Sequence, residues 1–173
     1  MAGFFEKMGK CALAIDEKNF EWLLKDGFMS ALGYFAVLFA FNCVMTFIMA
    51  VLQTGDLILA AVLMLMSALI NLLVMAAFLP IISHLLMGLF GGKRPLTDTL
   101  QIYFYAYTPY LAISWLGNIG SIFALISFGS AFRGVREINK AGFWQTFAAV
   151  LVPALVFVVF IVYVYLSLRD MVS

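Results

Sequence analysis

The residue best suited to acid–base chemistry is His84, the single histidine of this 173-residue chain. A histidine ring titrates near neutral pH, so it can pass a proton between two partners. A stripe of polar residues follows at helical spacing (i, i+4, i+8, i+11, i+15) on one predicted helix face: Thr99, Tyr103, Tyr107, Tyr110 and Ser114. We expect His84 to lie at the same depth as Tyr103 or Tyr107, which would form a polar centre.

Two interpretations of this centre are open. Polar side chains inside a membrane usually face other helices, so His84 can form a structural hydrogen bond that fixes helix packing. Alternatively, the centre takes part in transport or proton relay. No Asp or Glu lies inside any predicted span, which disfavours a proton-coupled pump.

A basic rim is predicted beside this centre, formed by Lys93, Arg94, Arg133 and Arg136. Such a rim can bind anionic lipid headgroups or phosphates. Equally, it can be only the charge signal that orients the chain in the membrane. The net charge of +1 gives no indication of nucleic-acid binding.

Motifs of catalysis and cofactor binding are missing from the sequence. It has no nucleophile elbow, phosphate-binding glycine loop, paired carboxylates or HExxH motif, so we expect neither an enzyme nor a cofactor. Methionines near His84 raise the idea of a soft-metal path, but methionine is a common filler of apolar cores, and we expect no metal.

The elements that must position these residues are membrane helices. The chain is 65% hydrophobic and 11% charged, whereas soluble domains are about 45–50% apolar and about 25% charged. A spanning helix needs about 20 apolar residues. We therefore predict an all-α polytopic membrane protein with an interfacial arm over residues 1–29 and one membrane domain over residues 30–168.

Five spans are predicted. The second is kinked at Pro80, which cannot bond to the Ala76 carbonyl. The Gly117–Gly120 cluster divides a 34-residue apolar stretch into a hairpin of two short spans, with a single tilted helix as the alternative. The predicted spans are 30–52, 57–90, 99–116, 120–132 and 144–168.

The N-terminal arm has the pattern of an amphipathic helix over residues 3–18. Its apolar face would contain Phe5, Met8 and Cys11, with Lys7 on another face, so the helix would lie in the membrane interface. A second interfacial piece follows, with Trp22 as an anchor. The arm is either a simple tether or a binding site for a protein partner.

The distribution of Lys and Arg predicts the orientation. A cytoplasmic N-terminus places nine basic residues inside and only Arg169 outside, as the positive-inside rule favours. We therefore predict the N-terminus in and the C-terminus out. If the protein is prokaryotic, its membrane would be the cytoplasmic membrane.

The ordered motifs from Pro80 to Gly134 resemble the Yip family of five-span membrane proteins. The resemblance covers about residues 25–168. The matching motifs, in chain order, are Pro80, His84, Gly91-Gly92-Lys93, Thr97-Asp98-Thr99-Leu100, Ala106-Tyr107-Thr108-Pro109 and Arg133-Gly134. The positions that match the family pattern most directly are His84, Gly91, Gly92, Lys93 and Pro109.

The resemblance implies a helical membrane domain without catalysis. In eukaryotic relatives it implies binding of Rab-type GTPases and a role in vesicle traffic, whereas this chain is similar to compact bacterial or archaeal members. We expect a protein that organises or shapes membrane or recruits partners, with a homo-oligomer as a further hypothesis. The alternative is a small transporter, channel or lipid-handling protein that uses His84 and the tyrosines.

Overall fold

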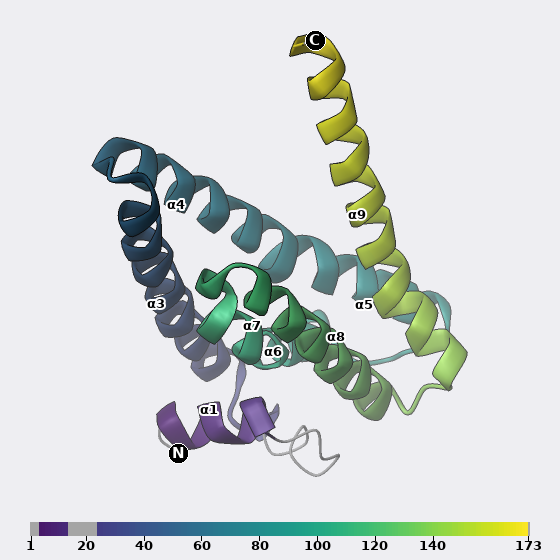
Figure 1. The fold of residues 1–173 in the computed structure, drawn as a ribbon. Helices are drawn as coiled ribbons and strands as arrows, with labels where there is room; N and C mark the ends of the chain where they lie inside the picture. Colours follow the sequence, from purple (N-terminus) through teal and green to yellow (C-terminus); the bar gives the residue numbers. More distant parts are fainter. Residues whose placement is uncertain (1–3, 14–23, 173) are drawn as a thin grey trace.

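Helices make up the regular structure of the described residues, which are 4–13 and 24–172 of a computed structural model (Figure 1). The arm contains α1 (Phe4–Leu13). The following helices are α3 (Phe28–Thr54), α4 (Leu57–Asn71), a π-helical segment (Leu72–Phe78), α5 (Leu79–Leu89), α6 (Leu96–Ala106), α7 (Thr108–Ile113), a 3-10 turn (Ser114–Leu116), α8 (Asn118–Asn139) and α9 (Phe143–Val172).

The ends of the helices gather at two opposite ends of the molecule. α1, the start of α3 and the α8–α9 loop lie at one end, which we call the α1 end (Figure 1). The α5–α6 loop is there too, because Arg94 bonds to the last turn of α8. The α3–α4 turn and the C-terminus lie at the opposite end. The α5–α6 and α8–α9 loops, which the predicted topology assigns to the same side as the N-terminal arm, therefore lie at the same end as α1.

Two helices among the described residues are long and apolar enough to cross a membrane. They are Phe28–Thr54 and the continuous run Leu57–Leu89. In the most apolar 18-residue stretch of each, only 22% and 17% is buried inside the protein. A core helix of a soluble protein would be mostly buried, so these helices have outer faces suited to lipid. They correspond to the first two predicted spans, and the other three remain predictions.

The turn between α3 and α4 follows from its polar residues. Gly55 adopts a left-handed conformation (φ 69°), and its N–H bonds to the Val51 carbonyl. The Asp56 side chain then caps α4 by accepting hydrogen bonds from the backbone N–H groups of Ile58 and Leu59.

The predicted kink in the second span takes the form of a π-helical segment. This segment begins at Leu72 and ends at Phe78, and its hydrogen bonds join residues five apart instead of four. The Leu79 N–H, for example, bonds to the Val74 carbonyl. Pro80 has no N–H to offer, so the irregular bonding lies on its N-terminal side.

Gly91 and Gly92 end α5 in a Schellman motif. The Gly92 N–H bonds to the Met87 carbonyl and the Gly91 N–H to the Gly88 carbonyl. Gly91 has a φ of +87°, and a Cβ at position 92 would lie 2.9 Å from the Asn139 side-chain oxygen. In this glycine pair, Gly91 therefore permits the turn, and Gly92 permits α8 to pack closely against it.

The predicted span 99–116 is not one continuous helix, because the chain breaks at Tyr107 between α6 and α7. Pro109 has no N–H for the Tyr105 carbonyl, and the Thr108 hydroxyl donates to that carbonyl instead at 2.7 Å. The Tyr110 N–H turns to the Ser127 hydroxyl of α8 at 3.2 Å. The polar stripe therefore does not follow one continuous helix face.

Two boundaries differ from the predicted spans. α6 begins at Leu96 rather than at position 99, with Pro95 at its N-cap and Asp98 in its first turn. The polar segment after position 132 continues α8 as helix to Asn139. Polar side chains there do not interrupt the helical bonding of the backbone.

The core surrounds α6. Residues 101–109 are all buried, and α6 packs against α3, α5 and α8. Phe104 stacks on Phe35 of α3, with ring centroids 4.7 Å apart. The family-type segment before Pro109 is therefore the centre of the molecule.

Candidate functional site

The structure places His84 beside Thr99, at the α1 end of the expected polar centre. The His84 Nδ1 and the Thr99 Oγ1 are 3.3 Å apart, His84 is half-buried and Thr99 is buried. This contact joins α5 to α6. The arrangement can fix the two helices to each other.

Tyr103 and Tyr107 lie deeper than His84 and do not share its hydrogen bond. Both are fully buried, and their rings are 5.8 Å apart. Their hydroxyls, and that of Ser83, make no hydrogen bond of good geometry to the described residues. The Ser83 and Tyr103 hydroxyls are neighbours, but they do not form such a bond with each other. An unpaired buried hydroxyl costs about 1–3 kcal/mol, so this cluster is a candidate site of ligand contact.

The rim residues are brought together only in part. Arg94 donates to the Ile138 carbonyl at 3.1 Å and pairs with Asp98 at 3.7 Å, which ties the α5–α6 loop to α8. Lys93, Arg133 and Arg136 are exposed. Arg94 is thus a structural member of the rim rather than a free cation.

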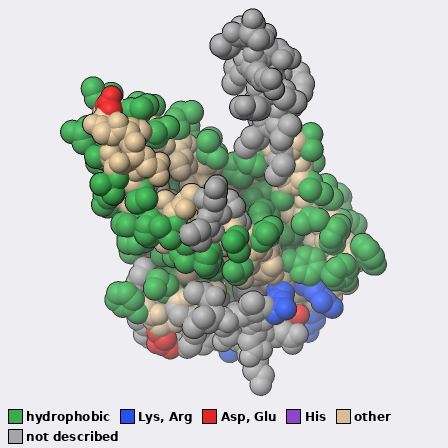
Figure 2. Space-filling view, in the orientation of Figure 1, with side chains coloured by type: hydrophobic (Ala, Val, Ile, Leu, Met, Phe, Trp, Pro, Cys, Tyr) green, Lys and Arg blue, Asp and Glu red, His purple; other side chains and the backbone are tan. Residues whose placement is uncertain are grey.

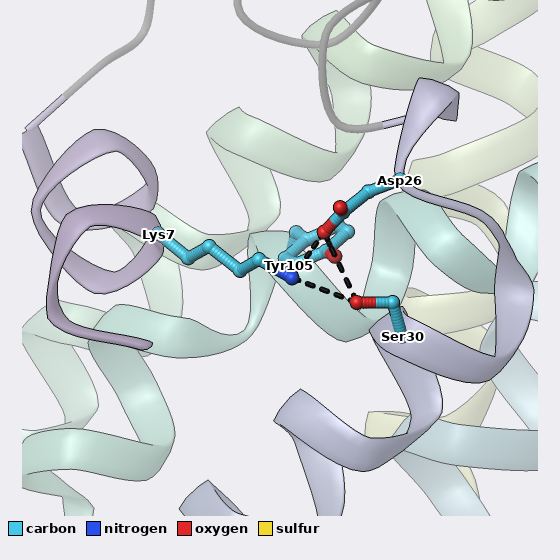
Figure 3. A network of polar contacts seen from close by, with 4 residues as sticks. All are labelled: Lys7, Asp26, Ser30 and Tyr105. Atoms are coloured by element: carbon cyan, nitrogen blue, oxygen red, sulfur yellow. Dashed lines mark hydrogen bonds and ion pairs between the residues drawn. The ribbon is translucent and has the colours of Figure 1, made fainter. Parts of the chain in front are cut away.

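The most connected polar site among the described residues was not predicted. The Lys7 ammonium of α1 forms an ion pair with Asp26 and donates to the Ser30 hydroxyl at 2.8 Å (Figure 3). The Asp26 carboxylate also accepts from Ser30 at 3.2 Å and from the Tyr105 hydroxyl at 3.3 Å. We call these four residues the arm latch, because they join α1 to α3 and α6.

Lys7 corrects the prediction for the arm, because its residue is 6% exposed instead of lying on a solvated face. Phe5, expected on the apolar face toward the membrane interface, is 79% exposed, and the interfacial position of α1 stays a prediction. Helical periodicity predicts which residues share a face, but the position of Asp26 decided which face docks. The predicted interfacial piece with Trp22 lies outside the described residues.

The charges of the arm latch stabilise one another. Burial raises the pKa of the Asp26 carboxyl, but the Lys7 ammonium and the hydroxyls of Ser30 and Tyr105 outweigh it. The pKa of Asp26 therefore lies below its ordinary value of 3.8. The ionised pair is the stable form at neutral pH.

Cys11 marks a second contact of α1 with the membrane helices. Its thiol is buried beside the hydroxyls of Thr108 and Tyr34, and burial raises its pKa from 9.0 to about 12. Tyr34 and Thr108 are themselves hydrogen-bonded at 3.0 Å. Because Thr108 gives its proton to the Tyr105 carbonyl, Tyr34 is the donor in this bond.

Asparagines inside the first two spans also bond across helices. The Asn42 side chain donates to the Leu111 carbonyl at 2.8 Å and to the Ser114 hydroxyl at 2.6 Å. Asn71 accepts from the Tyr110 hydroxyl at 3.3 Å. These bonds were not predicted, although a side-chain amide within an apolar span indicates a hydrogen bond to another helix.

The described residues offer no obvious metal chemistry. Within ranges 4–13 and 24–172, no group of three His, Cys, Asp or Glu side chains is arranged to hold a metal ion. The arrangement supports helix–helix bonding, docking of α1 and electrostatic contact at the rim.

Comparison with protein families matched residues 13–165 to the Yip1 domain. Comparisons with curated proteins and with solved structures returned no match.

Proposed function

Because the chain belongs to the Yip1 domain family, which is a membrane-associated family, we propose that it is a non-enzymatic protein that shapes membrane and recruits partners at its α1 end. One observation carries this proposal. The hairpin of α6, α7 and α8 lies in the half of the molecule nearest α1 and does not reach the opposite end (Figure 1).

The α6–α8 hairpin adds protein to the half nearest α1 only. The helices therefore occupy a larger cross-section at the α1 end than at the opposite end. A membrane that packs around such a wedge reduces its bending cost by curving, with the α1 side convex. The bonds of Asn42 and Asn71 support this role, because they hold the hairpin against the first two spans.

The test is reconstitution of the full chain into phosphatidylcholine vesicles at several protein densities, followed by cryo-electron microscopy. Vesicle diameter should fall as density rises in preparations with the α1 end outward, while a trapped dye should be retained as in protein-free vesicles. Diameters independent of density, or dye release that needs His84, would contradict the proposal.

A second candidate function is lipid handling through the buried hydroxyl cluster. The unpaired hydroxyls of Ser83, Tyr103 and Tyr107 favour it, because a polar ligand group would satisfy them. Transfer of fluorescent lipids between leaflets should then slow in the Tyr103→Phe/Tyr107→Phe variant. Equal transfer by wild type, variant and protein-free vesicles would exclude this role.

A further inference from the structure

Two loops at the α1 end are fixed against each other. The Arg94 guanidinium of the α5–α6 loop bonds to the Ile138 carbonyl of α8 at 3.1 Å. A Cβ on Gly92 would lie 2.9 Å from the Asn139 side-chain oxygen, so the backbone of the same loop approaches the end of α8 closely. These two contacts therefore hold the α5–α6 loop against the end of α8.

The joined loops present three exposed basic side chains, which we call the basic corner: Lys93, Arg136 and Lys140. The neighbouring acid Asp98 pairs with Arg94, and Glu137 is half-buried. Figure 2 shows Lys and Arg side chains gathered at the lower right of the molecule, near the α8–α9 loop. The corner therefore carries an excess of positive charge.

Large apolar side chains border the basic corner. Leu89 is 80% and Phe90 42% exposed at the end of α5, and Trp144 is 76% exposed at the start of α9. In Figure 2, hydrophobic surface continues directly beside the basic side chains. Tryptophan at a helix end is typical of headgroup depth in membrane proteins.

We propose that the basic corner binds the phosphate of an anionic phospholipid, with the acyl chains along Leu89, Phe90 and Trp144. The combination of charge and exposed apolar surface favours a lipid over free phosphate, because only the lipid satisfies both parts. This binding site is independent of the proposed role in membrane shaping. It assigns Arg94 a positioning role, since its bond to Ile138 aligns the two loops.

Lipid binding is measured by native mass spectrometry of the full chain titrated with phosphatidylglycerol, with phosphatidylcholine of the same chain length, and with inorganic phosphate. Wild type should prefer phosphatidylglycerol. The Lys93→Gln/Arg136→Gln/Lys140→Asn variant should bind it about fivefold more weakly for each charge removed. Asparagine is used at position 140 because it tolerates the left-handed backbone there (φ 49°).

The matched control is Lys10→Gln/Lys18→Gln/Lys25→Gln, which removes the same amount of charge from the arm. Its phosphatidylglycerol affinity should stay within about twofold of wild type, because the proposed site contains none of these three residues. Equal losses in both variants would show general charge attraction and overturn the site.

Two further variants separate lipid binding from the folding of the chain. If the triple variant unfolds, Lys93→Gln/Arg136→Gln leaves the turn at Lys140 intact and should still lower affinity for phosphatidylglycerol. Trp144→Ser should weaken lipid binding without affecting phosphate. Inorganic phosphate that displaces the lipid at equal concentration, or equal affinity for both lipids, would overturn the proposal.

Discussion

Lys7 and Asp26 show how one residue pair positions the whole arm. Their side chains are 7% and 10% exposed, so each charge has lost much of its contact with water. Transfer of a lone charge into such a site is costly, while a paired and hydrogen-bonded charge is tolerated. Ser30 and Tyr105 supply the extra hydrogen bonds. The docking of α1 therefore depends on all partners being present.

Loss of one charge should release the arm. In a Cys43→Ser background, Lys7→Met leaves Asp26 buried without its cation, and we expect Cys11 to react with a maleimide at least about tenfold faster. The reason is that Cys11 gains exposure and its pKa falls from about 12 toward 9.0. Thiol labelling over time measures the rate.

Lys25→Gln is the control, because it removes an exposed positive charge outside the latch. Its labelling rate should equal that of wild type. A Lys7→Met protein that labels at the wild-type rate would show that the ion pair does not hold α1.

The arm latch should also open in acid. The folded-state pKa of Asp26 lies below 3.8, so its contribution to docking is fully present above pH 3.8 and is lost as the pH falls through the folded pKa. A pyridyl disulfide that reacts with thiols in acid should label Cys11 faster below that range. In Asp26→Asn the labelling rate should lack this acid step, and a step that persists there would assign it to another group.

At the scale of elements, the break between α6 and α7 is stabilised by side chains from its neighbours. Pro109 removes one backbone donor, Thr108 compensates the Tyr105 carbonyl, and Ser127 of α8 accepts from Tyr110. Tyr34 of α3 adds a bond to the same Thr108 hydroxyl. Side chains of α3 and α8 thus bond to the chain at a point where a continuous helix was expected.

Thr108→Val should destabilise this junction. Valine has nearly the same shape but removes the hydroxyl that donates to the Tyr105 carbonyl and accepts from Tyr34. A buried polar group that loses its partner costs about 1–3 kcal/mol. Thermal unfolding in detergent should show a lower midpoint. Thr108→Ser keeps the hydroxyl and should lose less stability, so equal losses in both variants would contradict this role of the bond.

At the scale of the whole molecule, charge and shape differ between the two ends. The described basic residues of the rim belong to the α1 end, together with the arm latch and the wider cross-section. The opposite end carries the α3–α4 turn, where Asp56 is the exposed charge. Such asymmetry would give the protein one orientation in the membrane.

The predicted five-span orientation can be tested with single cysteines in a cysteine-free background. On intact cells, an impermeant thiol reagent should label Gln53→Cys and Ser173→Cys, because both positions would face outward. Lys93→Cys and Arg136→Cys should be labelled only after permeabilisation. Outside labelling at position 136 with protection at 173 would instead indicate four spans.

The sequence alone predicted the class of protein, its first two spans and its family, because these depend on local composition and short motifs. Long apolar runs require a membrane, and the polar residues at 53–56 require a turn whatever surrounds them. The Gly91-Gly92 pair marked a loop for the same reason, since its backbone conformation depends on the residues themselves.

Only the tertiary structure decided which polar groups meet. Tyr105 bonds to Asp26 across 79 positions and Asn42 to Leu111 across 69, and helical periodicity holds no information about such partners. The burial of Lys7 is decided in the same way, because a lysine is favoured inside only where a carboxylate from another element meets it. Distant pairing, rather than local pattern, therefore determines the arm latch. At Tyr107 the local Pro109 starts the break, and the tertiary structure adds the bonds from Tyr34 and Ser127.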